Sequence, residues 1–465
     1  MSLTTSHVVP APREQVWEWH TRPGALVRLT PPFLPFIPMK QADKLSDGTT
    51  IFGLPAGLKW VSRHDLSNYR RGHRFTDVCI NAPVKTLANW RHVHDFADHE
   101  DGTLVTDTVT TRLPANAMTS FFAYRQQQLI NDFLFLDHIA HLQPEKPLTI
   151  AMTGSRGLVG RALMAQLGTA GHHVIQLVRR NPKPYQRLWE PFSPAPDLLD
   201  GVDVLVHLAG EPLFGRFSNA HKQAIRDSRV TPTNRLARLV ADSPTVQTMI
   251  AASAVGYYGA DRGDEVLTET SERGEGFLAD VVSDWEAATV VAAEAGKRVL
   301  NVRFGSIMSG ISGMLPVLKA LFSTGLGGSF GDGQIWFPWI SIDDATDILT
   351  RGVLDPAWSG PVNAVSPTET LNRDLTAALS SELRRPAFIP IPSIGPAIIL
   401  GRQGAQELAL ANQRVAPQML LDADHTFRYP TLDRTLAHEL GGEDLFDKVR
   451  ELESPEEEKQ LGLDG

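Results

Sequence analysis

The chain has 465 residues, of which 42% are apolar and 21% charged, and this ordinary globular composition is spread over enough length for two or three domains. Its formal charge of -9 lies mostly in residues 443–465, which hold nine acidic side chains against three basic ones, so the rest is too weakly charged to predict a nucleic-acid-binding surface. Cys79 is the only cysteine, which argues against a disulfide framework. No apolar run approaches the ~18 residues of a membrane span, and no signal-peptide pattern opens the chain. These features argue against a membrane protein and favour a cytoplasmic protein.

The first 145 residues predict a mixture of strands and helices. The stretch SHVVPAPREQVWEWHTRPGALVRLTPPF joins a strand to a short helix with an aromatic face, and Thr- and Val-rich runs such as GTLVTDTVTTRLP follow, with turn residues between them. The closing stretch SFFAYRQQQLINDFLFLDHIAHL predicts a long helix. One side of that helix is apolar and holds Phe122, Leu129, Phe133, Leu136 and Ala140.

A strand, a short helix, an antiparallel sheet and a long last helix make a helix-grip pattern. On these segments, and above all on VWEWHTRPGALVRLTPP, residues 1–145 resemble START-like or polyketide-cyclase-like ligand-binding domains. The resemblance implies an α+β domain whose sheet wraps around the last helix and leaves an apolar cavity. Two interpretations stay open: the cavity binds a small hydrophobic ligand, or the core is filled and the domain serves only assembly. The stretch LQPEKP, residues 142–147, is the expected linker.

Nine of the fifteen histidines lie in this region, and His92 and His94 in WRHVHDF would point the same way from a strand. No cysteine lies near them and no third ligand stands at a recognisable spacing. The sequence therefore predicts no metal site.

A glycine-rich loop begins the next region. PLTIAMTG has the pattern of a buried strand, LVGRALMAQLGTAGH predicts a helix, and Gly154, Gly157 and Gly160 lie between or just inside them. In a dinucleotide-binding fold the first glycine allows the tight turn, the second lets the backbone approach a pyrophosphate and the third allows close helix–strand packing. Strand, loop and helix in this order predict such a site.

The second strand, HVIQLVRR, indicates which nicotinamide cofactor binds. No Asp or Glu occurs from Ser155 to Tyr185, although an NAD-preferring site usually places an acid there for the ribose 2′-hydroxyl. Arg179 and Arg180 end the strand instead, and Arg156 lies in the glycine loop. Guanidinium groups would bind a 2′-phosphate, so the sequence favours NADP.

Further strands, VDVLVHLAG, VQTMIAASAVGYYG and RVLNVRFGSIMSG, continue the pattern of a doubly wound parallel sheet of the Rossmann type. Together with TGSRGLVGRAL, IRDSRV, DWEAA and GLGGSFGDGQIWFPWISIDD, they resemble an atypical group of extended short-chain dehydrogenases/reductases, the NAD-dependent epimerase/dehydratase-like or nucleoside-diphosphate-sugar epimerase-like proteins. The resemblance implies one α/β domain over residues 146–441, with a small C-terminal substrate lobe. The charge distribution predicts an acidic tail over 442–465.

The resemblance also assigns cofactor contacts. The residues that would border the pyrophosphate are Gly154, Ser155, Arg156, Leu158 and Val159, alongside the turn glycines Gly157 and Gly160. Arg179, with Arg180, would meet the 2′-phosphate. The residues near the adenosine ribose would be Leu208, Ala209 and Gly210. The residues that line the rest of the cleft would be Arg229 and Ile307.

The catalytic pair of that family is missing. Its members use a Tyr whose pKa is lowered by a Lys four residues later, but aligning DWEAA with the family helix puts Leu278 and Val282 at those places. Candidates for the proton donor are Ser253, Tyr257, Tyr258 and Glu211. Tyr258 is favoured among them. The alternatives are that Tyr258 packs as an aromatic, that Glu211 serves as a helix cap or structural hydrogen-bond partner, and that Ser253 is only a strand-end hydroxyl.

Two functions follow from these residues. The first is an NADP-dependent oxidoreductase or epimerase-like enzyme that transfers a hydride to a small carbonyl or nucleotide-sugar-like substrate and carries a fused ligand-binding domain. The second is a protein that senses NADP(H) or binds a ligand and has lost catalysis with the Tyr/Lys pair. Arg303 and Arg414 would meet an anionic substrate or pair with carboxylates, and Asp343 and Asp344 are expected to cap a helix.

Overall fold

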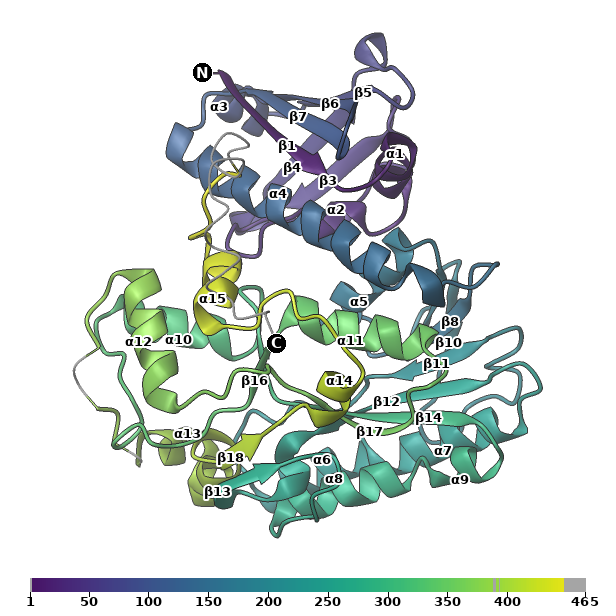
Figure 1. Ribbon diagram of the computed structural model, residues 1–465, viewed down its shortest axis with the longest axis vertical. Helices are drawn as coiled ribbons and strands as arrows, with labels where there is room; N and C mark the ends of the chain where they lie inside the picture. Colours follow the sequence, from purple (N-terminus) through teal and green to yellow (C-terminus); the bar gives the residue numbers. More distant parts are fainter. Residues whose placement is uncertain (1, 388–389, 393, 447–465) are drawn as a thin grey trace. The chain divides into compact units, whose positions relative to one another are not determined.

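A computed structural model of the chain describes residues 2–387, 390–392 and 394–446 (Figure 1). These residues form two compact units. Unit 1 holds residues 2–138 and the described residues after 440, and unit 2 holds Ile139–Leu440. The change from one to the other therefore falls at residues 138 and 139, ahead of the linker expected at 142–147. Within the described residues, no helix is both long and apolar enough to span a bilayer.

Unit 1 is built on one antiparallel sheet with the strand order β1-β7-β6-β5-β4-β3-β2. Its strands are β1 (Ser2–Val9), β2 (Ile37–Lys40), β3 (Thr49–Gly53), β4 (Lys59–His64), β5 (Arg74–Cys79), β6 (Arg91–His99) and β7 (Gly102–Thr110). Its helices are α1 (Arg13–Thr21), α2 (Ala25–Arg28), α3 (Val84–Ala88) and the long α4 (Ala115–His138). The expected order of strand, short helix, sheet and long helix is present.

The core of unit 1 lies between α4 and the sheet. Phe122, Leu129 and Phe133 of α4 are buried in two clusters with residues of the strands, such as Phe96 of β6. Full burial of a side chain as large as Leu or Phe stabilises the fold by roughly 1.5–3 kcal/mol. The prediction that Ala140 continues this apolar face was wrong, because α4 ends at His138 and Ala140 is exposed.

The chain returns to unit 1 after residue 440. Leu445 packs against the apolar cluster that contains Trp60 and Phe122, and the Phe446 N–H donates to Gln126 Oε1 at 2.9 Å. The described start of the predicted acidic tail, residues 442–446, thus makes contacts within unit 1. The remainder of that tail, residues 447–465, lies outside the described residues.

Unit 2 contains the predicted Rossmann-like sheet, which is parallel throughout and has the order β10-β9-β8-β11-β12-β14-β17. Its strands are β8 (Thr149–Thr153), β9 (His173–Val178), β10 (Gln186–Leu188), β11 (Val204–His207), β12 (Thr248–Ala254), β14 (Arg298–Phe304) and β17 (Gly360–Ala364). The helices on one face are α5 (Leu158–Thr169) and α11 (Ile342–Leu354), and those on the other are α6 (Asn219–Asp227), α7 (Val230–Asp242), α8 (Phe277–Ala287) and α9 (Val290–Glu294) (Figure 1). The doubly wound fold is confirmed.

The strand order reverses direction at β8. The chain moves from β8 to β9 on one side and then returns to place β11 on the other side of β8. In open parallel sheets, ligands bind outside the carboxyl ends of the strands at such a switch point. The residues that follow β8 and β11 therefore mark the first place to look for a site.

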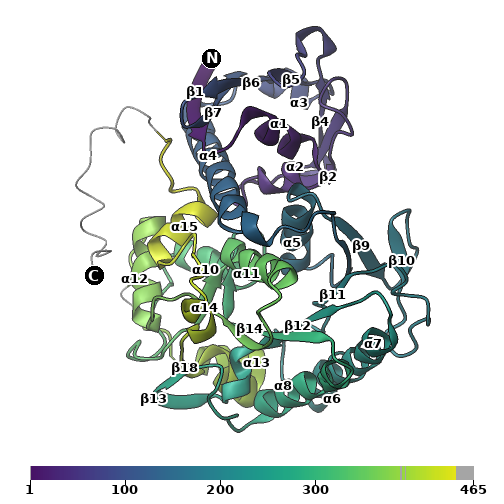
Figure 2. The same ribbon diagram turned by 45° about the vertical axis from the view of Figure 1, so that its right-hand side comes forward.

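A smaller lobe follows the sheet of unit 2. It contains the two-stranded sheets β13–β18 and β15–β16, with the bounds Asp261–Leu267, Asn412–Val415, Ser306–Met308 and Trp339–Ser341. Figure 2 shows α10 (Met314–Ser323), α12 (Asn372–Leu383) and α15 (Leu432–Leu440) grouped together in this lobe, where they share one buried cluster. The remaining helices are α13 (Ile394–Gly404) and α14 (Gln418–Asp422).

Candidate functional site

Glycines shape the loop between β8 and α5. Gly154 has a φ of 68°, and a Cβ at this residue would lie 2.7 Å from the carbonyl carbon of Leu208, just after β11. A Cβ on Gly160 would overlap the carbonyl oxygen of Gly154. Because a side chain at either position would displace backbone, the two glycines hold the start of α5 against the end of β11 at the switch point.

The N-terminus of α5 faces this loop with unused backbone donors. The helix begins at Leu158 after Gly157, which has no side chain to cap it. Gly157 is exposed, Leu158 and Val159 are partly buried, and Ser155 is buried. The first N–H groups of a helix lack intrahelical partners and carry a partial positive charge, so this end can bind an anion such as a pyrophosphate.

A buried hydrogen-bond chain fixes the ends of β8 and β11. The N–H groups of Leu208 and Ala209 donate to Thr153 Oγ1 at 3.1 and 3.2 Å, which leaves the Thr153 hydroxyl to donate to His207 Nδ1 at 2.7 Å. His207 Nε2 then donates to Thr233 Oγ1 at 3.0 Å. Burial lowers the pKa of His207 to about 4, so the ring is neutral and can play both parts. His207 was not among the predicted site residues, although it lies inside the strand pattern VDVLVHLAG.

Three arginines expected at the cofactor are exposed. Arg156 lies in the glycine loop, and Arg179 and Arg180 directly follow β9. Across the described part of the chain, none of the three guanidinium groups takes part in an ion pair or a hydrogen bond with the protein. They are therefore available to an anionic ligand.

Arg229 lies beside the third predicted contact region. Its guanidinium carbon would be 3.1 Å from a Cβ on Gly210, so the absence of a side chain there lets the charge approach the end of β11. The same carbon lies 5.1 Å from the ring centroid of Trp285. Burial lowers the pKa of Arg229 to about 10, and Glu211 opposes that shift. No carboxylate of the described residues forms an ion pair with this buried cation, an arrangement that favours an anionic ligand.

Glu211 itself is exposed. Its backbone N–H donates to Ser228 Oγ at 2.9 Å, whereas the N-cap of the following helix, α6, is Ser218. The alternative that Glu211 caps this helix was therefore wrong. Within the described residues, the Glu211 carboxylate makes no contact with Ser253. The catalytic role of Glu211 therefore stays a prediction.

Ser253, at the end of β12, contacts a buried ion pair. Its Oγ donates to Glu286 Oε1 at 2.6 Å, and Arg303 of β14 donates to both carboxylate oxygens of Glu286 at 2.8 Å. The Arg303 side chain is 3% exposed and that of Glu286 14%. Glu286 was not among the predicted site residues, although it is the second acid in DWEAA, one helical turn after Val282 and thus on the side of α8 turned to the sheet.

The structure corrects the preference for Tyr258 as proton donor. Tyr258 is fully buried, and its hydroxyl lies 2.7 Å from Asn363 Oδ1, 2.9 Å from the Thr268 carbonyl oxygen and 3.0 Å from Arg303 Nη1. Burial raises the pKa of Tyr258 to about 12. A hydroxyl surrounded by protein partners has neither the access nor the acidity to protonate a substrate, so the packing alternative describes Tyr258 better.

Tyr257 differs from its neighbour in exposure. Its side chain is partly exposed, and Arg303 lies over its ring with 3.6 Å between the guanidinium carbon and the ring centroid. No hydrogen bond of the Tyr257 hydroxyl occurs among the described contacts. The ring is therefore held in place while its hydroxyl remains free for a ligand.

The face of α8 that meets the end of β12 is aliphatic. A Cβ on Gly256 would lie 3.5 Å from Leu278 Cβ and 3.9 Å from Val282 Cγ2. Leu278 and Val282 thus occupy the place expected for the family's Tyr and Lys, and both are buried. Neither side chain can transfer a proton.

The remaining arginine of the lobe pairs within the protein. Arg414 of β18 donates to both carboxylate oxygens of Glu369 at 2.8 and 2.7 Å and lies over the ring of Trp336. Arg303 pairs with Glu286, so both arginines follow the alternative of structural ion pairs. Ile307, on β15, is partly buried, as a residue lining a cleft would be.

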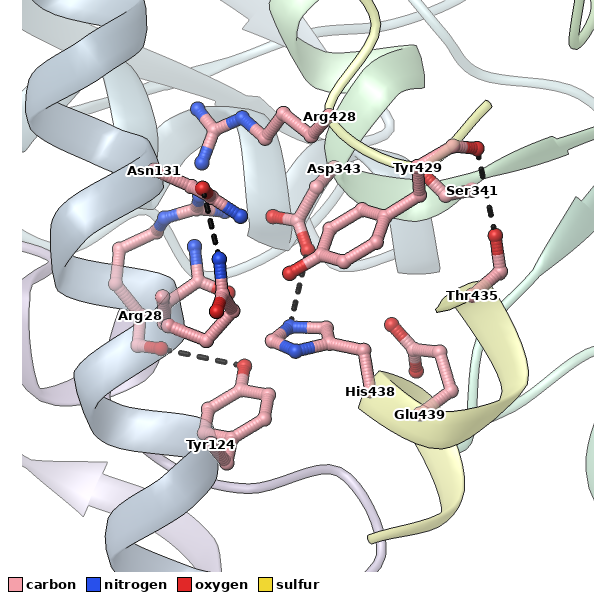
Figure 3. Close-up of polar contacts among 12 residues, drawn as sticks. Arg28, Tyr124, Asn131, Ser341, Asp343, Arg428, Tyr429, Thr435, His438 and Glu439 are labelled. Carbon is pink, nitrogen blue, oxygen red and sulfur yellow. Dashed lines mark hydrogen bonds and ion pairs between the residues drawn. The ribbon is translucent and has the colours of Figure 1, made fainter. Parts of the chain in front are cut away.

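Asp343 and Asp344 begin α11, but Ser341 is its N-cap. Ser341 Oγ accepts from the Asp344 N–H at 2.9 Å and donates to Asp344 Oδ2 at 2.6 Å. Asp343 instead lies 3.5 Å from His438 of α15, and Glu439 lies beside this pair (Figure 3). Burial raises the pKa of Glu439 to about 7. The expected capping by both aspartates is thus correct only in part, since Asp344 supports the cap and Asp343 does not.

Unit 1 holds a cavity of about 150 Å³. Its wall combines rings such as Phe52, Trp60 and Phe75 with polar groups that include His64 and Arg125. An apolar cavity of this size accepts a benzene-sized molecule. The cavity therefore has room for a small apolar molecule, and the ionisable groups of its wall could bind a polar group of that molecule.

Comparison with known proteins connects unit 2 to a family. A family model described as "NAD dependent epimerase/dehydratase family" matches residues 150–357, and a "Domain of unknown function (DUF1731)" matches residues 391–439. Epimerase family protein Mb2239 of Mycobacterium bovis is 40% identical over 293 residues, which make up 62% of this chain and 96% of that protein.

Two solved structures extend the comparison. The structure described as the nucleoside-diphosphate sugar epimerase from Corynebacterium glutamicum is 57% identical, with a TM-score of 0.87, and the match covers 98% of this chain and 95% of that one. Human epimerase family protein SDR39U1, crystallised with NADPH, is 28% identical, with a TM-score of 0.58, over 63% of this chain and 99% of its own. The bacterial structure thus matches the chain through both units.

Proposed function

Because the chain belongs to the NAD dependent epimerase/dehydratase family, we propose that unit 2 is an NADP-dependent oxidoreductase or epimerase-like enzyme. The observation that carries this proposal is the switch point, where the glycine loop, the start of α5 and the buried Arg229 converge on the end of β11. Backbone donors and an unpaired cation in this arrangement suit the phosphates of a dinucleotide.

The exposed arginines after β9 favour NADP over NAD. Arg179 and Arg180 stand where an NAD-preferring site has an acid, and their guanidinium groups are free of protein partners within the described residues. The human relative, which was crystallised with NADPH, points the same way. A 2′-phosphate would make charge-assisted hydrogen bonds with these groups.

We expect NADPH to bind more tightly than NADH in calorimetric titration. Arg179→Ala should reduce the ratio of the two dissociation constants by about tenfold or more, because a charge-assisted hydrogen bond contributes roughly 1.5–3 kcal/mol. Arg235→Ala, which removes an exposed arginine from α7, serves as the charge-matched control and should leave the difference unchanged. Equal affinity of the native chain for the two cofactors would contradict the NADP assignment.

The reaction we propose is hydride transfer between the nicotinamide and a substrate carbon beside the end of β12. In the reducing direction bound NADPH would supply a hydride to the carbonyl carbon, and a protein group would supply the proton to the carbonyl oxygen. Tyr257, Ser253 and Glu211 remain the candidates for that group. The substrate class is a small carbonyl compound or a nucleotide-sugar-like molecule, the latter suggested by the description of the Corynebacterium glutamicum protein.

A second function is favoured by the aliphatic face of α8. With Leu278 and Val282 in place of a Tyr and a Lys, unit 2 could bind NADP(H) as a sensor without turning over substrate. NADPH oxidation, followed by absorbance against a panel of aldehydes, ketones and nucleotide sugars, separates the two functions. Tight NADPH binding without turnover of any compound would favour the sensor.

For unit 1 we propose a START-like domain that binds a small hydrophobic ligand. The support is the long α4 packed on an antiparallel sheet, together with the aromatic cavity. We expect benzene to bind with one site per chain in calorimetric titration. Ala42 lines the cavity, so the larger side chain of Ala42→Phe should occupy part of its volume. Because the cavity has little spare volume, ligand binding should weaken by about tenfold or more.

The control for this experiment is Leu66→Phe. Leu66 is 62% exposed in unit 1 and does not line the cavity, so its enlargement should not change the affinity for benzene. Equal binding by Ala42→Phe and the native chain would place the probe elsewhere. It would then favour the alternative of a filled core.

A further inference from the structure

Strand register brings four ionisable side chains together in the sheet of unit 1. Asp77 of β5 pairs in register with His92 of β6, and His94 of β6 pairs with Asp107 of β7. Because alternate residues of a strand point to the same face, His92 and His94 lie side by side, with 3.7 Å between their ring centroids. All four side chains are buried or nearly so.

Asp107 fixes one nitrogen of each imidazole. His92 Nε2 lies 2.7 Å and His94 Nδ1 2.9 Å from the same oxygen, Asp107 Oδ1. These are hydrogen-bond distances, and a carboxylate can only accept, so both nitrogens donate. In a neutral imidazole the other nitrogen then carries a lone pair, and here these are His92 Nδ1 and His94 Nε2.

The two remaining nitrogens converge on Asp77. Each lies 3.6 Å from Asp77 Oδ2, beyond hydrogen-bond range, and the three atoms lie within 4.8 Å of one another. When both imidazoles are neutral, three lone pairs thus face a common point. With metal–ligand distances of about 2.0–2.1 Å, ligand atoms around a tetrahedral ion stand about 3.3 Å apart, close to the spacing found here.

We propose that Asp77, His92 and His94 bind a divalent transition-metal ion of the zinc class. Two imidazoles and one carboxylate suit Zn²⁺, Fe²⁺ or Co²⁺ rather than Mg²⁺ or Ca²⁺, which prefer oxygen ligands alone. Asp107 orients both rings from behind, as the carboxylate partners of metal-bound histidines commonly do. The ion also balances the negative charges of the two buried aspartates.

The three ligand residues also line the cavity of unit 1. Three protein ligands leave a tetrahedral ion one open position, which water or an oxygen atom of a bound molecule fills. The proposal does not depend on the ligand-binding function of unit 1, since the metal alone is the probe in the test. No metal site is predicted from the sequence because the third ligand comes from another strand and has no characteristic spacing.

The test uses the full, untagged chain, stripped with a chelator and then dialysed. Titration with Co²⁺ should give the visible absorption of a tetrahedral nitrogen- and oxygen-ligated ion, saturating at about one equivalent per chain, and Zn²⁺ should displace it. X-ray absorption of the zinc form should show two imidazole ligands. A native chain that binds neither ion at micromolar concentration would overturn the proposal and leave a proton on His94 as the link between the aspartates.

Variants locate the site. His92→Gln and Asp77→Asn should abolish the one-equivalent binding, and Asp107→Asn should weaken it by about 10–100-fold. The controls are His99→Gln and His438→Gln, each of which alters a different group of His and carboxylate residues in the described chain, and both should still bind one equivalent. Metal binding that survives in His92→Gln but is lost in a control variant would overturn the assignment. Circular dichroism identifies variants that fail to fold.

Discussion

Replacing Glu286 with glutamine is expected to lower the free energy of unfolding by about 3–5 kcal/mol, because it removes one partner of a buried ion pair and leaves the other charge uncompensated. Arg303 is 3% exposed and donates to both oxygens of the Glu286 carboxylate at 2.8 Å. Glutamine keeps the shape of the side chain but loses the charge and one acceptor. Urea denaturation of the full chain, followed by circular dichroism, measures the difference.

The same helix offers a matched control. Asp280 of α8 pairs with Arg273 at 3.1 Å, but the two side chains are 55% and 44% exposed. Exposed ion pairs contribute only about 0–1 kcal/mol, so Asp280→Asn should change stability little. If Glu286→Gln proved no more destabilising than Asp280→Asn, the pair would not have the structural importance that we infer from its burial.

The glycine loop could be predicted from the sequence because its constraints are local. Gly154 needs a positive φ and Gly160 needs room beside the loop backbone, and both requirements appear directly as glycines between a strand pattern and a helix pattern. The acid-free stretch before Arg179 is local information of the same kind. The parallel sheet followed from repeated apolar runs, each ending in small residues.

The ion pair of Glu286 and Arg303 could not be predicted in this way. One partner lies on a helix and the other on a strand, so their contact depends on how α8 packs against the sheet. The metal-site residues pose the same difficulty, because the contact of Asp77 with His92 depends on strand register. Sequence spacing carries no signal for either contact.

The two neighbouring tyrosines show a third limit. Tyr257 and Tyr258 lie in one short 3-10 turn, where adjacent side chains point in different directions, and only the fold decides which one is enclosed. The preference for Tyr258 rested on its place before a glycine. Packing against Val255, Leu267 and Val415 buries that side chain instead.

Tyr257→Phe is therefore expected to reduce NADPH-dependent turnover by about 10²–10⁴-fold on a substrate that the native chain accepts, since a well-placed general acid contributes about this factor. NADPH affinity should stay nearly unchanged, because the substitution removes only one hydroxyl. Stability should change by less than about 0.5 kcal/mol, because Tyr257 is partly exposed and its hydroxyl has no protein partner among the described contacts.

Tyr258→Phe is the matched variant and should show the opposite pattern. It removes a buried hydroxyl from Asn363, Arg303 and the Thr268 carbonyl group, which should cost about 1–3 kcal/mol of stability while turnover of the folded protein falls far less than in Tyr257→Phe. The two measurements, steady-state NADPH oxidation and urea denaturation, separate the roles. Full turnover in Tyr257→Phe would exclude Tyr257 as the proton donor. Ser253 and Glu211 would then remain, to be tested as Ser253→Ala and Glu211→Gln. A loss of turnover in Tyr258→Phe alone would instead identify Tyr258 as the donor despite its burial.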